Sequence, residues 1–183
     1  MKVIVVCYPT FGGSGVLATE LGHKLAKMGH EIHFIAYEMP VRLIPDNESI
    51  YFHKVNVPFY PLFNFQPYEL ALSSKLVDVC IKYSIDLIHV HYAIPHAYAA
   101  YMAKKMLFSE KINVPIVTTL HGTDITLVGK HPFYKPAVKF SIENSDVVTS
   151  VSESLKNNTI DFFDVKKDIT VVPNFVDLSK FKA

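Results

Sequence analysis

The sequence has no tryptophan, only two cysteines, a single arginine and no long hydrophobic run. Cys7 and Cys80 are each flanked by apolar residues, so they indicate buried thiols in a reducing compartment and exclude a disulfide framework. No stretch approaches the roughly 18 apolar residues of a membrane span, and the run 3–7 is too short for a signal peptide. The sequence therefore predicts a cytoplasmic protein with no membrane partner.

An excess of charge of one sign is also missing. Lys plus Arg total 18 and Asp plus Glu total 17 among 183 residues, which leaves a formal net charge of +1 at pH 7. A balanced chain has no broad positive field for a polyanion, and this argues against nucleic acid as a partner. Half of the residues are hydrophobic, and the length suits one domain with a full core.

Short runs rich in Val, Ile and Thr alternate with helical stretches along the chain. This alternation is typical of β-α-β units whose parallel strands are buried on both sides. We therefore predict an α/β fold, a doubly wound and mainly parallel sheet of about seven strands with helices on both faces. The expected strands lie near residues 2–7, 31–37, 51–57, 86–91, 115–120, 147–151 and 169–172, and the expected helices near 15–28 (closed by Gly29), 67–83, 95–108, 134–145 and 152–163.

Three glycines within four positions, Gly12, Gly13 and Gly15, join the first strand to the first helix. Glycine lets backbone N–H groups come close to a ligand, and the helix that follows directs its positive dipole end at the same place. This segment therefore predicts an anion site. A glycine loop that serves only the packing of helix against sheet is the alternative interpretation.

The same segment also fits a dinucleotide site. Gly13, Gly15 and Ala18 satisfy the pattern G-x-G-x-x-G/A, and Glu38 stands at the end of the second predicted strand. Residues 9–11 lengthen the loop before the glycines, whereas the dinucleotide motif usually turns directly out of the strand. An NAD-binding oxidoreductase domain is thus an alternative to a site for a substrate phosphate or carboxylate.

His89 and His91 close one predicted strand, and the two-residue period puts both imidazoles on one face. A metal site normally needs a third or fourth ligand, and no Cys or carboxylate lies at a suitable spacing. We therefore interpret the pair as a polar strand end that lines a cleft, and we predict no metal. His96, at the start of the next predicted helix, is expected at the surface or as a capping residue.

A polar segment, residues 118–124 (Thr-Thr-Leu-His-Gly-Thr-Asp), follows the next predicted strand. Its side chains emerge at the carboxyl edge of the sheet, where doubly wound sheets bind ligands. His121 is the main candidate for ligand contact, and a helix cap by Asp124 with an incidental His121 is the alternative. Arg42 lies in a loop beyond the second strand, where its guanidinium suits a dicarboxylate, although a solvated loop is the simpler interpretation.

Four segments, in this order, resemble the family-4 retaining glycosyltransferases of the GT-B fold. They are the glycine loop 12–15, the strand end 88–92 (Ile-His-Val-His-Tyr), the turn 121–124 and the segment 172–177 (Val-Pro-Asn-Phe-Val-Asp). The resemblance covers essentially the whole chain, and the glycine segment is most similar to members that begin bacillithiol biosynthesis. It implies a Rossmann-like N-terminal half, with residues 1–172 as the acceptor-side domain, 173–183 as the start of an interdomain linker and the donor-binding domain outside the chain.

The resemblance also implies a reaction. N-acetylglucosamine would pass from UDP-N-acetylglucosamine to the hydroxyl of L-malate with retained configuration, through a front-face displacement that needs no protein nucleophile, cofactor or metal. A family-4 enzyme with a different acceptor is the alternative. The isolated chain is expected to be inactive, and its open cleft face to favour homo-oligomers.

Carried onto this sequence, the resemblance assigns a role to each candidate residue. His121 is the catalytic-site residue, near the anomeric carbon of the donor sugar. The substrate-binding residues are Gly13, Ser14 and Gly15 between the donor phosphates and the acceptor carboxylate, Tyr92 and Thr119 in the acceptor pocket beside Thr118, Asn174 at the cleft, and Arg42 at a malate carboxylate.

Overall fold

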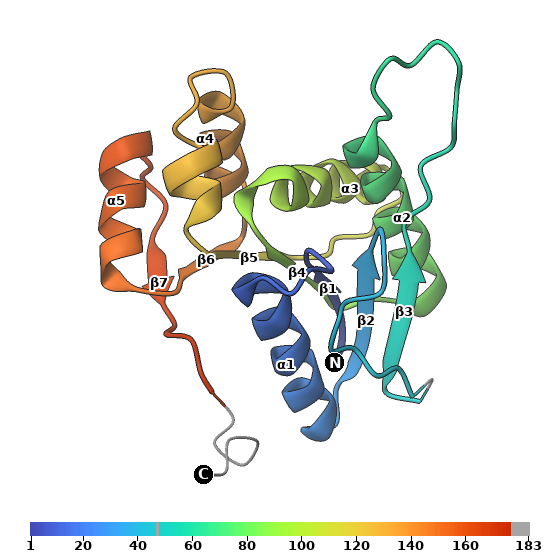
Figure 1. Ribbon diagram of the computed structural model, residues 1–183. Coiled ribbons are helices and arrows are strands. Elements are labelled where there is room, and N and C mark those ends of the chain that lie inside the picture. The colour runs from blue at the N-terminus through green and yellow to red at the C-terminus, as the bar shows by residue number, and fades with distance from the viewer. Residues whose placement is uncertain (47, 177–183) are drawn as a thin grey trace.

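The computed structural model describes residues 1–46 and 48–176 and shows one sheet of seven parallel strands (Figure 1). The strand order is β3-β2-β1-β4-β5-β6-β7, and every pairing is parallel. All seven predicted strands are confirmed. They are β1 (Lys2–Val6), β2 (Glu31–Ala36), β3 (Ile50–Lys54), β4 (Leu87–His91), β5 (Ile116–Leu120), β6 (Val147–Ser150) and β7 (Ile169–Val171).

Helices lie on both faces of the sheet, as predicted. Helix α1 (Gly13–Lys27) packs on one face, where Val5 and Phe34 form a core with Ala18. On the opposite face, Ile4 and Ile88 belong to a core with two of the other helices, and Leu120 and Val148 belong to a core with the remaining two. These helices are α2 (Tyr68–Tyr83), α3 (Tyr98–Ser109), α4 (Lys135–Glu143) and α5 (Glu153–Phe163).

Two short turns at the carboxyl edge differ from the prediction, and the first is not a regular helix, because its Ile94 is extended (φ −130°, ψ 142°). The turn η1 (Ala93–Ala97) follows β4, and the turn η2 (Asp124–Val128) follows β5. In η1 the N–H of Ala97 donates to the carbonyl of Tyr92 at 3.2 Å, so α3 starts at Tyr98 and not at residue 95.

The strand order reverses direction between β1 and β4. From β1 the chain continues through α1 on one face, whereas from β4 it continues through α3 on the other. Val6 pairs with Val90 in the register, so the loop after β1 and the turn after β4 begin side by side. Such a topological switch point leaves a crevice at the carboxyl ends of the strands, which is where open α/β sheets bind ligands.

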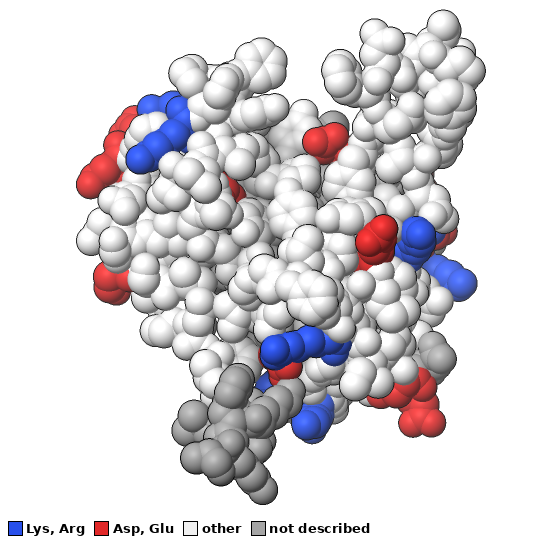
Figure 2. Space-filling model, in the orientation of Figure 1, with Lys and Arg blue, Asp and Glu red and all other residues white. Residues whose placement is uncertain are grey.

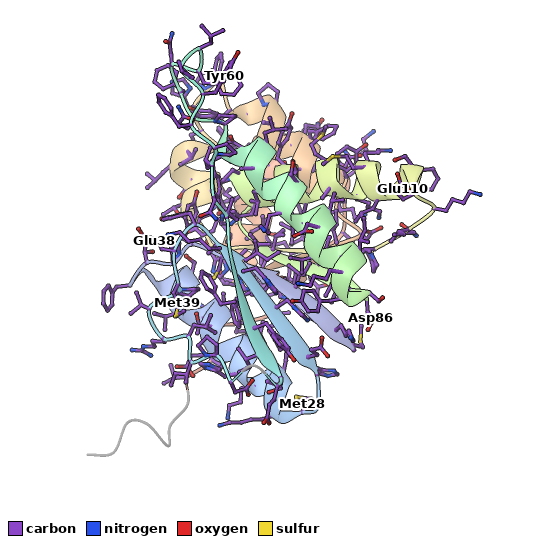
Figure 3. The ribbon with its side chains drawn as sticks, turned by 90° about the vertical axis from the view of Figure 1, so that its right-hand side faces the viewer. Met28, Glu38, Met39, Tyr60, Asp86 and Glu110 are labelled. Atoms are coloured by element: carbon purple, nitrogen blue, oxygen red, sulfur yellow. The ribbon has the colours of Figure 1, made fainter. Side chains whose placement is uncertain are left out.

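The side view separates the carboxyl ends of the strands from their amino ends. Figure 3 shows Glu38 and Tyr60 toward the carboxyl edge, and Met28 and Asp86 toward the opposite edge. The segment between β3 and α2 projects beyond the sheet and exposes Phe59 and Phe65 (Figure 1). Figure 2 shows a notch in the upper outline of the molecule, with most charged side chains away from it.

Candidate functional site

The N-terminus of α1 offers backbone donors at the crevice. Gly12 precedes the helix in an extended conformation (φ −60°, ψ 150°), no side chain caps the first turn, and that turn contains no acidic residue. Within the part of the chain that the structure describes, the N–H groups of Gly13 and Ser14 make no hydrogen bond. Free donors at the positive end of a helix can bind an anion, and the anion site that the glycines predicted stays a prediction.

Glycine is required for packing at one position of this loop and not at another. A Cβ on Gly15 would lie 2.4 Å from the carbonyl oxygen of Tyr8 and 2.8 Å from that of Thr10, so packing requires glycine there. A Cβ on Gly13 would meet nothing within 4 Å. The packing interpretation therefore applies to Gly15, and the open space in front of Gly13 is available to a ligand.

Tyr92 connects the glycine loop to the turn after β5. Its hydroxyl lies 3.2 Å from the hydroxyl of Ser14, which donates to it, and 2.9 Å from that of Thr123. The backbone of Tyr92 has φ +93° and ψ 137°, a conformation that side-chain-bearing residues rarely adopt. Such conformations persist where the surroundings hold them, and they are frequent at functional sites.

His121 lies in the same group, between two aromatic rings. Its Nε2 is 2.8 Å from Nδ1 of the buried His91, and its ring stacks on that of Tyr92 with centroids 5.5 Å apart. Burial, assisted by the nearby His89, lowers the pKa of His121 to about 4. Burial also lowers the pKa of His91 well below its ordinary value, so both rings are neutral at pH 7.

Thr119 belongs to a polar ladder across three strands. Its hydroxyl is 2.8 Å from Nε2 of His89 on β4 and 2.8 Å from the hydroxyl of Thr149 on β6. The predicted common face of His89 and His91 is confirmed, since their rings stack with centroids 4.6 Å apart. Thr118, which we placed beside the acceptor pocket, is buried on the opposite face and bonds to Ser145, because side chains alternate along a strand.

Asp124 ties the two polar turns together. Its carboxylate accepts the N–H groups of Gly122 at 3.0 Å and His121 at 3.3 Å with one oxygen, and that of Ala93 at 3.1 Å with the other. Burial raises the pKa of this carboxyl, and the three backbone hydrogen bonds oppose that effect. Asp124 thus stabilises the turn that carries His121, because its side chain accepts N–H groups from both turns.

The expectation for His96 is wrong. His96 is completely buried, and its Nδ1 donates to the carbonyl oxygen of His91 at 2.5 Å. Its ring also packs 4.6 Å from that of Tyr8. The side chain of His96 points inward because the turn η1 bends at the extended Ile94, whereas the prediction had a regular helix from residue 95.

A pocket of about 550 Å³ lies beside this group. It is bordered by the segment after β1, the two turns, and the starts of α2 and α4, with Tyr8, Tyr92 and Thr123 among its lining residues. Glu69 is the exposed charged side chain in its wall, and no Lys or Arg of the described residues lines it. Thr123 belongs to the polar segment 118–124 that the sequence indicated, whereas Tyr8 was not predicted as a site residue, because its place in the pocket wall depends on the fold.

Two predicted site residues lie elsewhere. Arg42 is exposed, lies 3.6 Å from Glu20 across an ion pair, and lines a second pocket of about 780 Å³ that shares no lining residue with the first. Asn174 is exposed in the segment after β7. The roles of both residues stay predictions.

Metal ligands and membrane spans were also sought. Among residues 1–46 and 48–176, no three His, Cys, Asp or Glu side chains are grouped as a metal site would require. In the same residues, none of the helices has both the length and the apolar character of a membrane span.

Comparison with known proteins finds similar sequences among glycosyltransferases. The family model described as Glycosyltransferase Family 4 matches residues 11–180. The N-acetyl-alpha-D-glucosaminyl L-malate synthase of Bacillus anthracis is 52% identical over 97% of this chain and 46% of that protein. An uncharacterised glycosyltransferase of Methanocaldococcus jannaschii is 28% identical over 86% of this chain and 42% of its own length. The chain therefore spans about half the length of these curated relatives.

Solved structures agree on the fold. The Anabaena protein HepE, solved in complex with UDP-glucose, superposes with a TM-score of 0.69 at 14% identity, over 98% of this chain and 45% of that one. At this identity the likeness shows the architecture alone, which is the predicted Rossmann-like one.

Proposed function

We propose, because this chain belongs to glycosyltransferase family 4, that it is the acceptor-side part of a retaining enzyme that transfers N-acetylglucosamine from UDP-N-acetylglucosamine to L-malate. The observation that carries the proposal is the convergence of the free N–H groups of α1, the Ser14–Tyr92–Thr123 bonds and His121 at the switch point. The 52% identity to a synthase named for this reaction supports the choice of substrates. The NAD-binding alternative loses its motivation, because the same glycines belong to a glycosyltransferase sequence.

The arrangement suits catalysis by positioning. The N–H groups of Gly13 and Ser14 would bind an acceptor carboxylate, a donor phosphate, or both in turn, with the helix dipole supplying positive potential. Tyr92 and the Ser14 hydroxyl would orient the acceptor, while the neutral His121 would contact the donor sugar. We assign no nucleophile, cofactor or metal, since a front-face displacement rests on orientation and electrostatics.

The test uses the complete gene product that contains these 183 residues. We expect UDP release from UDP-N-acetylglucosamine in the presence of L-malate, and formation of an α-linked product. Succinate is the matched control, because it carries both carboxylates but lacks the acceptor hydroxyl, and it should inhibit without being glycosylated. UDP release with another hydroxy acid and none with L-malate would replace malate by a different acceptor.

The 183-residue chain by itself is proposed to bind but not to turn over, since basic groups for the donor pyrophosphate do not line its pocket. Homo-oligomers through the open face are part of the same proposal. Measurable transfer by this chain alone would contradict the first point, and a concentration-independent monomer in sedimentation would contradict the second.

A further inference from the structure

His91 and His121 are joined by a hydrogen bond between two ring nitrogens, and one of these nitrogens must carry the proton. Nδ1 of His91 and Nε2 of His121 are 2.8 Å apart, and both imidazoles are neutral at pH 7. In a neutral imidazole one nitrogen donates and the other accepts. One ring must therefore donate to the other, and the direction of this bond decides where the second proton of the pair lies.

The far side of His91 favours one direction. The ring is 2% exposed and lies between His89 and His121, with centroids 4.6 and 5.1 Å away. Among residues 1–46 and 48–176, its Nε2 has no hydrogen-bond partner. If Nδ1 accepted, the proton of His91 would be on Nε2, as a buried N–H with nothing to bond. If Nδ1 donates, Nε2 is an unpaired lone pair, and buried polar groups without partners are less rare as acceptors than as N–H donors.

We infer that His91 is a positioning residue that donates its Nδ1–H to Nε2 of His121 and thereby fixes the proton of His121 on Nδ1. The neighbouring histidines leave this assignment intact. His89 bonds to Thr119 through Nε2, and His96 uses its Nδ1–H on the carbonyl of His91, so neither competes for the proton between His91 and His121. Among the described residues, Nδ1 of His121 is not one of the buried side-chain atoms that lack a hydrogen-bond partner. This nitrogen is therefore accessible from outside the protein.

This tautomer defines what His121 can do. An Nδ1–H can donate to a hydroxyl, phosphate or carboxylate oxygen of a ligand, but it cannot accept a proton. In the proposed transferase, on which this consequence alone rests, His121 would hold a sugar oxygen as a neutral donor and would not act as a base. His91 would act only through His121, from a fully buried position.

The experiment reads the two nitrogens directly. In long-range ¹H–¹⁵N spectra of the ¹⁵N-labelled chain at pH 7, His121 should show a protonated Nδ1 and a bare Nε2, with a preference of about tenfold or more for this tautomer. A scalar coupling across the N–H···N bond should connect Nε2 of His121 with Nδ1 of His91. A protonated Nε2 on His121, an even mixture of tautomers or a doubly protonated ring would overturn the inference.

Two variants separate this role from packing. His91→Phe keeps a ring of similar size but has no donor, so His121 should become a mixture of tautomers. His89→Gln keeps a nitrogen for Thr119 and should leave the tautomer of His121 unchanged. An unchanged tautomer in folded His91→Phe would contradict the inference, and the wild-type spectrum decides the matter if that variant does not fold. None of these readouts depends on sugar transfer, so they can fail or succeed independently of the proposed function.

Discussion

Gly13 and Gly15 illustrate how neighbouring residues of one loop serve packing and ligand access separately. We expect Gly15→Ala to lower the free energy of unfolding by about 1–3 kcal/mol, because the new methyl group would lie 2.4 and 2.8 Å from two backbone carbonyl oxygens and the backbone would have to shift. Gly13→Ala should leave stability unchanged or slightly higher, since its methyl group enters open space at the first turn of a helix. Urea unfolding of both variants measures the difference.

Gly13→Ala should weaken ligand binding, although it should leave stability unchanged. Its methyl group occupies the space through which an anion would approach the N–H groups of α1, so affinity for UDP-N-acetylglucosamine or L-malate should decrease. Calorimetric titration of the complete gene product checks this. Unchanged affinity in Gly13→Ala would show that the ligand does not use this end of the helix.

Tyr92 tests whether the bonds between the loops act together. Tyr92→Phe removes the hydroxyl that bonds to Ser14 and Thr123, and we expect a stability loss of about 1 kcal/mol because this hydroxyl is only partly buried. Ser14→Ala removes one of the two bonds. In the double variant, the loss should be smaller than the sum by about 0.5–1 kcal/mol, since both single changes delete the same bond. Strict additivity in urea unfolding would mean that the two hydroxyls do not interact.

At the level of elements, Asp124 holds η1 and the turn after β5 against each other. Asp124→Ala would leave three backbone N–H groups without their buried acceptor, and we expect a loss of about 2–4 kcal/mol. Asp46→Ala is the matched control, because Asp46 also accepts three backbone N–H groups, but at an exposed site where water can replace it. Thermal unfolding should therefore show a much larger shift for Asp124→Ala. Equal shifts would mean that burial is not what makes Asp124 important.

Periodicity predicted the elements well where their signal is local. The strands are short β-branched runs buried on both sides, and each expected one is present. The turns η1 and η2 were not predictable in this way. Their conformations depend on contacts between β4 and β5, such as the bond from the N–H of Tyr92 to the carbonyl of Thr119, which join residues 27 positions apart.

The location of the candidate site could be predicted from the sequence, but most of its side-chain contacts could not. Polar residues after β1, β4 and β5 had to meet, because the carboxyl ends of parallel strands share one edge. The separation of Thr118 from Thr119 was available from the two-residue period. The inward position of His96 and the separate pocket of Arg42 were not, since they depend on the path of turns and loops.

On the scale of the whole molecule, neutral buried histidines make stability depend on pH. Burial lowers the pKa of His53, His89, His96 and His121 from an ordinary value of 6.5 to about 4. Burial also lowers the pKa of His91 well below that ordinary value. Between pH 6.5 and 4 the unfolded chain therefore binds more protons than the folded one. Their contribution is complete above pH 6.5 and is lost as the pH falls toward 4.

We expect the free energy of unfolding to fall steeply from pH 6.5 to 4.5, as urea titrations at a series of pH values would show. Carboxylates with a lowered pKa, such as Asp146, lose their contribution only at lower pH, so histidines dominate this window. His96→Asn is the informative variant, because its amide can still donate to the carbonyl of His91 while one buried base is removed. The slope of stability against pH near pH 5 should then decrease by about one proton. An unchanged slope, or flat stability in the parent chain, would mean that these histidines are protonated in the folded protein.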